Sequence, residues 1–227
     1  MKIDALGDSA LIIDLADERS TSCKLLARVL SAAKTIEDAK LAGVVDITTS
    51  YESLAVFYKP NRIDLNLEDK LRALVAAPGV GVRGKKRRIE IPVCYDPEFG
   101  FDIDRVASHT SLSPDTIVAL HSSAKYTVAC IGFMPGFPFL AGLPQDLRVP
   151  RLESPRTKVP PGSVAMANAQ AGIYPLESPG GWNVIGRTPL RLFRVDESPP
   201  TLLRPGDVVQ FLRITRPQFK ELNGKAD

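Results

Sequence analysis

The stretch from residue 132 to residue 191 constrains the fold most, because it combines dense turn residues with short apolar runs. It holds ten of the nineteen prolines and eight of the sixteen glycines in the chain. Proline lacks a backbone donor and glycine weakens regular elements, so a long helix is excluded here. Short apolar runs between turns predict a β-barrel or a sandwich. The segment begins GFMPGFPFLAGL, and we expect this aromatic surface to line a pocket or to meet a partner.

The first part of the chain has the pattern of a small α/β unit. Gly7-Asp8 separates two apolar runs, which is a hairpin signal. The elements expected after it are a helix at 21–41, strands at 44–48 and 54–58, and a helix at 67–77. We therefore predict an α+β chain, with a small N-terminal α/β sandwich domain at residues 1–84 and a β-barrel domain at residues 85–227.

Two short helices are predicted at residues 102–109 and 113–123. Ser113 is a good N-cap, with Pro114 at the first helical position and Asp115 near the positive end of the helix dipole. The pair resembles a helix-turn-helix, but Asp115 would repel phosphate where a recognition helix needs basic or amide side chains. We therefore expect a connector packed on the barrel. The net charge of +3 is too small to argue for a nucleic-acid partner.

Composition excludes several classes of protein. No apolar run is long enough to span a membrane, and the acid-containing start MKIDALGDSA is not a signal peptide. The scattered cysteines Cys23, Cys94 and Cys130 favour buried thiols in a reducing cytoplasm over disulfides or a zinc site. The two histidines form no HExxH pair, so no dedicated metal centre is expected, and a site built from carboxylates stays open as the alternative.

Motifs for nucleotide binding and serine hydrolysis are weak or absent in this sequence. A GxGxxG spacing occurs at Gly79, Gly81 and Gly84. A dinucleotide loop follows a strand and opens a helix, whereas this motif follows a predicted helix and precedes a strand, so we interpret it as a linker. No GxxxxGK[ST] motif occurs, so an ATP site would be non-standard or would lie on another chain. The lack of GxSxG argues against covalent serine hydrolysis.

Positive charge gathers in the proline-rich stretch. Residues 132–191 contain six arginines and lysines against three acids, a balance of +3 that equals the net charge of the whole chain. Arginine's planar fork suits carboxylates and phosphates, so we predict a concave anion-binding face. Ordinary barrel turns with surface arginines are the alternative. His121, at the end of the second short helix, is either a satisfied helix-terminal histidine or a site residue.

Three segments closely resemble the allophanate hydrolase subunit 1 family: GFMPGFPFLAGLP, PRLESPRTKVPPGSVAMANAQAGIYPLESPGGWNVIGRTPLRLF and LLRPGDVVQF. ALGDSAL and the IPVCYD…LHSSAKYTV run also look like that family's, so the resemblance covers nearly the whole chain. It implies a small N-terminal α/β domain followed by a cyclophilin-like β barrel. The family includes the B subunit of bacterial 5-oxoprolinase and the sporulation kinase inhibitor KipI.

The resemblance also implies an activity and partners. The chain would be the B subunit of an ATP-dependent 5-oxoprolinase complex, which cleaves 5-oxo-L-proline to L-glutamate with ATP hydrolysis. Its partners would be the C subunit, of the allophanate hydrolase subunit 2 type, and the A subunit. ATP would be bound by the complex and not by this chain alone, so we expect the isolated chain to be inactive. Two alternatives stay open: inhibition of a sensor histidine kinase, and a role in a urea carboxylase or allophanate hydrolase system.

The chemistry of lactam opening suggests roles for residues in the shared motif. Amide resonance resists attack, so the site needs positive charge and fixed donors more than a nucleophile. Arg187 would bind an anionic group, Glu177 would orient Arg187 or act as acid or base, and His121 would carry protons; these three are the expected catalytic residues. The expected substrate-binding residues are Phe133, Arg156, Tyr174, Gly180, Gly181, Trp182 and Thr188.

Overall fold

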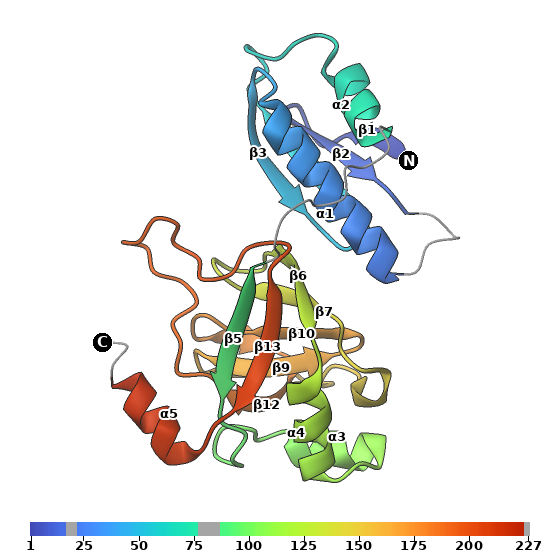
Figure 1. Ribbon diagram of the computed structural model, residues 1–227. Coiled ribbons are helices and arrows are strands. Elements are labelled where there is room, and N and C mark those ends of the chain that lie inside the picture. Colours follow the sequence, from blue (N-terminus) through green and yellow to red (C-terminus); the bar gives the residue numbers. More distant parts are fainter. Residues whose placement is uncertain (17–21, 77–86, 225–227) are drawn as a thin grey trace. The chain divides into compact units, whose positions relative to one another are not determined.

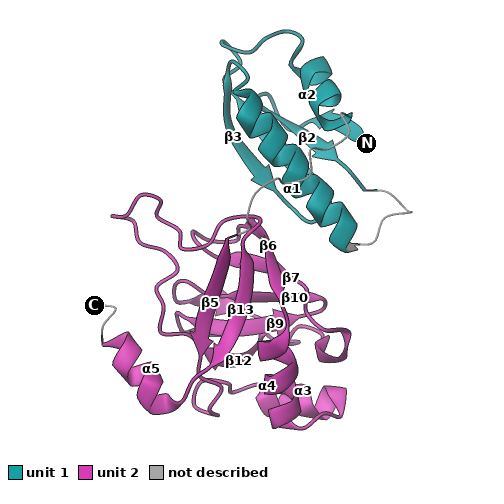
Figure 2. Ribbon diagram, viewed as in Figure 1, with its two compact units in different colours: residues 1–85 teal, residues 86–227 magenta. Residues whose placement is uncertain are grey.

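The chain folds as two separate units, residues 1–85 and 86–227 (Figure 2). The computed structural model describes residues 1–16, 22–76 and 87–224 (Figure 1). The predicted boundary between residues 84 and 85 lies outside the described residues, as does the GxGxxG motif. Each unit buries its own hydrophobic cluster, which is the property expected of a domain.

The first unit is an antiparallel four-stranded sheet with two helices (Figure 1). Its elements are β1 (Lys2–Ala5), β2 (Ala10–Asp14), α1 (Ser22–Ala39), β3 (Val44–Thr49), β4 (Ser53–Tyr58) and α2 (Leu67–Ala76). The strand order is β1-β2-β4-β3. Gly7, with a φ of 69°, forms the predicted turn between β1 and β2. The apolar stripe of α1, including Leu25, Val29 and Ile36, packs into the core. The predicted elements of this part are confirmed.

The second unit is a nearly closed, barrel-like sheet of seven strands in the order β12-β9-β10-β7-β6-β13-β5. Its elements are β5 (Arg88–Val93), α3 (Ile103–Thr110), α4 (Pro114–Ser123), β6 (Tyr126–Ile131), β7 (Pro138–Ala141), η1 (Gln145–Leu147), β8 (Arg156–Val159), β9 (Ser163–Ala167), β10 (Gln170–Ile173), β11 (Ser178–Gly180), β12 (Asn183–Arg187), β13 (Val208–Arg213) and α5 (Arg216–Asn223). An antiparallel bridge between Cys94 and Arg187 joins the ends of the two edge strands, with both backbone hydrogen bonds at 2.9 Å. Strands β8 and β11 form a separate two-stranded sheet. The predicted α+β class with a β-barrel is confirmed.

Helices α3 and α4 lie beside the barrel in Figure 1, and their apolar faces join its core. Val106, Ile117 and Val118 are buried in the same cluster as the barrel strands. Ser113 caps α4 as expected, because its hydroxyl accepts a hydrogen bond from the backbone N–H of Thr116 at 3.2 Å. The prediction of a helical connector packed on the barrel is confirmed.

The described residues contain no helix with the length and apolar character needed to cross a membrane, and no group of His, Cys, Asp and Glu side chains that could hold a metal ion. All three cysteines are free. Cys94 is buried. At Cys130, partial burial of its own thiol raises the pKa to about 11, so this thiol is protonated at neutral pH. The prediction of buried thiols holds for Cys94 alone: Cys130 is half-buried, and Cys23 is exposed because it lies outside the buried stripe of α1, which begins at Leu25.

Candidate functional site

A pocket opens where the irregular segment before β7 meets the turn that leads into β12. Its volume is about 260 Å³, slightly below the range of roughly 300–1,000 Å³ for drug-sized ligands, so it suits a smaller molecule. We call it the aromatic pocket. The residues that line it are Phe133, Phe137, Phe139, Arg151, Pro155, Tyr174, Pro179, Gly180, Gly181 and Trp182.

Phe137 is the centre of the aromatic wall. Its ring centroid lies between 5.0 and 5.6 Å from those of Phe133, Phe139, Tyr174 and Trp182. Three of these four contacts are edge-to-face, the arrangement that aromatic pairs prefer. The Phe137 side chain is buried, so the wall behind the pocket is fixed by packing.

Phe133 lies at the edge of this cluster and is 66% exposed. Its φ of 66° is in the left-handed region, which is unusual and unfavourable for an aromatic residue. Two backbone hydrogen bonds hold the turn in place: the Met134 N–H donates to the Gly132 carbonyl oxygen at 2.7 Å, and the Phe137 N–H donates to the Met134 carbonyl oxygen at 3.1 Å. An exposed aromatic side chain on a strained backbone beside a pocket is typical of a residue that contacts a ligand or a partner.

Arg151 and Tyr174 give the aromatic pocket its polar groups. The guanidinium carbon of Arg151 lies 6.0 Å from the centroid of the Trp182 ring, at the outer limit of a cation–π contact. Burial raises the pKa of the Tyr174 hydroxyl, and a hydrogen bond from the backbone of Trp182 opposes that shift. Tyr174 is therefore a neutral hydroxyl that can donate a hydrogen bond. The pocket therefore suits a small, partly apolar anion, because it combines aromatic rings with the Arg151 cation and the Tyr174 hydroxyl donor.

Gly180 leaves room for the Tyr174 ring. A Cβ at position 180 would lie 2.8 Å from Tyr174 Cζ, closer than such atoms pack. Gly180→Ala is therefore expected to displace the ring and to lower the free energy of unfolding by about 1–3 kcal/mol. Gly181→Ala is the matched control, because a Cβ there would meet nothing closer than Pro155 at 3.5 Å. Urea unfolding measures both variants, and equal stabilities would contradict this account of the pocket wall.

A second, more open hollow lies next to the aromatic pocket. We call it the arginine hollow; it is lined by Arg105, Leu152, Glu153, Ser154 and Arg156 and has a volume of about 490 Å³. The segment between Arg151 and Arg156 contributes to both sites, because Arg151 and Pro155 line the aromatic pocket.

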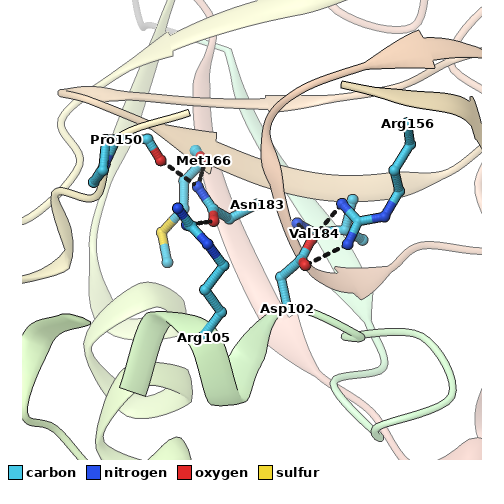
Figure 3. Close-up of polar contacts among 7 residues, drawn as sticks. All are labelled: Asp102, Arg105, Pro150, Arg156, Met166, Asn183 and Val184. Carbon is cyan, nitrogen blue, oxygen red and sulfur yellow. Dashed lines mark hydrogen bonds and ion pairs between the residues drawn. The ribbon is translucent and has the colours of Figure 1, made fainter. Parts of the chain in front are cut away.

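Arg156 is held by the buried carboxylate of Asp102, as Figure 3 shows. Its guanidinium donates two hydrogen bonds to Asp102, at 2.5 and 2.9 Å. Asp102 also accepts a hydrogen bond from the backbone N–H of Val184 at 2.7 Å. The Phe101 ring lies against the guanidinium, with its centroid 4.8 Å from Arg156 Cζ. This two-point pairing fixes the guanidinium and neutralises its charge.

Arg105 is held by a neutral amide in the same view (Figure 3). Its guanidinium donates a short hydrogen bond to Asn183 Oδ1. The amide nitrogen of Asn183 donates in turn to the carbonyl oxygens of Pro150 at 2.9 Å and Met166 at 3.1 Å. Because Asn183 is fully buried and its amide is fully engaged, the position of Arg105 is set by the barrel strands.

The structure brings together five of the seven predicted substrate-binding residues. Those that line the aromatic pocket are Phe133, Tyr174, Gly180, Gly181 and Trp182. Arg156 lies in the neighbouring arginine hollow. Thr188 lines neither; it is buried, and its hydroxyl accepts a hydrogen bond from the backbone of Leu190 at 3.2 Å. The roles assigned to these residues stay predictions.

Arg187 and Glu177 have other partners than the predicted ones. Arg187 Nε donates to the carbonyl oxygen of Pro161 at 2.7 Å, and burial lowers the pKa of its guanidinium. Glu177 forms an exposed ion pair with Lys158 at 3.0 Å. Neither residue lines the aromatic pocket or the arginine hollow. The structure therefore offers no contact through which Glu177 would orient Arg187.

His121 lies in the barrel core and is fully buried. Its Nδ1 lies 2.8 Å from the Tyr95 hydroxyl, and its ring stacks on Phe211 with centroids 4.5 Å apart. Burial lowers the pKa of His121 to about 3, so the ring is neutral at physiological pH. His121 lines neither the aromatic pocket nor the arginine hollow.

The sequence analysis did not single out Asp102, Arg105, Arg151 or Asn183, which supply or hold the charged groups of these sites. Arg151 had a signal, because it belongs to the arginine-rich stretch. Asp102 and Arg105 had none, since their partners Arg156 and Asn183 lie 54 and 78 residues away in the sequence.

Two comparisons decide the family. Residues 1–203 match the family described as carboxyltransferase domain, subdomain C and D. The chain is also 40% identical to the B subunit of 5-oxoprolinase from Bacillus subtilis (strain 168), over 96% of this chain and 95% of that protein. The chain belongs to the family of 5-oxoprolinase B subunits. This membership confirms the resemblance carried by the Gly/Pro-rich motifs.

Solved structures support the fold of this homologue of the 5-oxoprolinase B subunit. The crystal structure of TTHA0988 is 38% identical, with a TM-score of 0.77 over 92% of this chain, and the match spans 40% of the TTHA0988 chain. The K. lactis urea amidolyase is 18% identical, with a TM-score of 0.76 over 99% of this chain and 15% of its own. At that identity the second likeness concerns the fold alone. In both, the equivalent of this chain is part of a longer polypeptide.

Proposed function

We propose that this chain acts as the B subunit of an ATP-dependent 5-oxoprolinase, which opens 5-oxo-L-proline to L-glutamate. The observation that carries the proposal is the match to the Bacillus subtilis B subunit, because it extends over nearly the full length of both chains at 40% identity.

The aromatic pocket is the proposed binding site for the lactam. 5-Oxo-L-proline is a small ring with one carboxylate, which suits a pocket of about 260 Å³ with aromatic walls and the Arg151 guanidinium. The neutral Tyr174 hydroxyl would donate a hydrogen bond to a ligand oxygen. Among the described residues that line this pocket, none is a serine, a cysteine or a carboxylate. This chain would therefore bind and orient the ring and would not supply a nucleophile.

The activation of the lactam would come from the assembled complex. In the overall reaction, one water adds across the lactam C–N bond and a second water cleaves the terminal phosphoanhydride of ATP. ATP, when bound by the complex, supplies a phosphoryl group that can activate the amide oxygen. In this reaction, this chain would hold the lactam ring and place positive charge beside a developing anion.

The proposed partners are the C subunit, of the allophanate hydrolase subunit 2 type, and the A subunit. The Bacillus subtilis relative is named as the B subunit of its enzyme, which implies a complex of several subunits. The unmatched 60% of the TTHA0988 chain fits a fusion to a partner, since the match spans only 40% of it. A cytoplasmic location would suit the use of ATP and the free thiols of this chain.

Deletion of the gene in the source organism tests the proposed function. We expect the deletion strain to accumulate 5-oxoproline and to lose growth on it. A plasmid copy of the wild-type gene, or of the Arg148→Met control, restores both. Arg151→Met is expected to restore them poorly, because it removes the cation of the aromatic pocket. Unchanged 5-oxoproline levels would contradict the proposal, and a gain of sensor-kinase activity in the deletion strain would favour the KipI-type alternative.

A further inference from the structure

The arginine hollow holds two guanidinium groups that the proposed function does not use. Arg105 comes from α3 and Arg156 from β8, and both line the hollow. Figure 3 shows the two groups standing apart, with Asn183 and Asp102 between them. A ligand that reaches both guanidiniums must therefore carry two separated acceptor groups.

Both guanidiniums are fixed before any ligand arrives. Arg105 is held by Asn183, which is fully buried and bonded to two backbone carbonyls. Arg156 is held by both oxygens of Asp102, which is 4% exposed. Fixed donors lose little side-chain entropy on binding, which is the property of a preorganised site.

The two groups differ in charge. Arg105 keeps its full positive charge, because its partner Asn183 is neutral. Arg156 is neutralised by Asp102, yet a guanidinium carries more N–H donors than the two bonds to Asp102 use. Arg105 therefore offers a charge-assisted contact to one carboxylate, and Arg156 offers hydrogen bonds to a second.

Glu153 adds a negative charge to the same hollow. Its side chain is exposed and makes no ion pair with any residue that the structure describes. A carboxylate in this place repels a multiply charged phosphate and attracts an ammonium group. The charges of the hollow thus favour a ligand with two carboxylates and one ammonium over a simple oxyanion.

We propose that the arginine hollow binds a free dicarboxylic α-amino acid, with its carboxylates at Arg105 and Arg156 and its ammonium at Glu153. L-glutamate has these three groups, whereas 5-oxo-L-proline has one carboxylate and no ammonium. If the proposed function holds, the hollow is a product site beside the lactam pocket; only this reading rests on that function. The binding itself follows from the charges and contacts of the hollow.

Isothermal titration of the full chain tests the proposal, with L-glutamate, glutarate, L-glutamine and inorganic phosphate as probes. We expect saturable binding of L-glutamate, and weaker binding of glutarate, which lacks the ammonium, and of L-glutamine, which lacks the second carboxylate. Arg105→Met should weaken L-glutamate binding about tenfold or more. Arg148→Met is the matched control, since Arg148 is exposed and lies outside the hollow, and it should bind as the wild type does.

Glu153→Gln keeps the test decisive if Arg105→Met fails to fold, because Glu153 is exposed. It should weaken L-glutamate binding without weakening glutarate binding. Three results would overturn the proposal. They are no binding of L-glutamate, binding of phosphate as tight as that of L-glutamate, and an unchanged affinity for L-glutamate in both Arg105→Met and Glu153→Gln. The assay contains neither ATP nor the partner proteins, so its failure would leave the proposed function standing, and an inactive complex would leave the binding result standing.

Discussion

Asp102→Ala is expected to lower the free energy of unfolding of the second unit by about 3–5 kcal/mol, because it removes one partner of a largely buried ion pair. The Asp102 carboxylate accepts two hydrogen bonds from Arg156 and one, at 2.7 Å, from the backbone N–H of Val184. In the variant, that N–H loses an acceptor and Arg156 loses its counter-charge. Water reaches Arg156, whose side chain is 31% exposed, so the lower end of the range is the expected value.

Trp182 gives a direct measurement of this effect. It is the chain's single tryptophan and belongs to the second unit, so its fluorescence in urea follows the unfolding of that unit. The control is Asp115→Ala, which breaks an exposed ion pair with Arg213 at 3.4 Å and should change stability by about 1 kcal/mol or less. Similar losses in the two variants would show that the Asp102 pair is not a buried anchor.

Acid is expected to destabilise the second unit through His121. The pKa of this histidine falls from 6.5 to about 3 on folding because burial disfavours the charged ring. The unfolded chain therefore binds a proton that the folded chain does not. The stabilisation is complete above pH 6.5 and is lost as the pH falls from 6.5 towards 3, at about 1.4 kcal/mol per pH unit and roughly 5 kcal/mol in total.

His121→Asn isolates this contribution from that of the carboxylates. The Asn oxygen can replace Nδ1 as the partner of the Tyr95 hydroxyl, but it does not titrate in this range. We expect the variant to be less stable at pH 7 and to lose less stability than the wild type between pH 6.5 and 4. His109→Gln is the control, since His109 is exposed. Parallel stability curves for wild type and His121→Asn would rule out a buried neutral histidine.

The sequence predicted the local elements well, because their signals are local. The hairpin at Gly7 and the Ser113 cap depend on neighbouring residues, and both are in place. The aromatic pocket could also be predicted from the sequence, because its rings come from two Gly/Pro-rich segments of the family motif, around Phe137 and Trp182.

The pairing of charged side chains was not predictable in the same way. Glu177 precedes β11, which pairs with β8, and it therefore forms its ion pair with Lys158 of β8. Arg187 ends β12, where the barrel closes on Cys94. Which strands pair, and in which register, decides which charges meet, and spacing along the chain does not reveal it.

If the proposed function holds, this chain is a necessary component of a 5-oxoprolinase. The most direct test measures ADP and L-glutamate formed from ATP and 5-oxo-L-proline by the purified A and C subunits, with and without this chain. We expect coupled formation of both products when all three proteins are present, and none with this chain alone or with its two partners alone. Equal rates with and without this chain would contradict it.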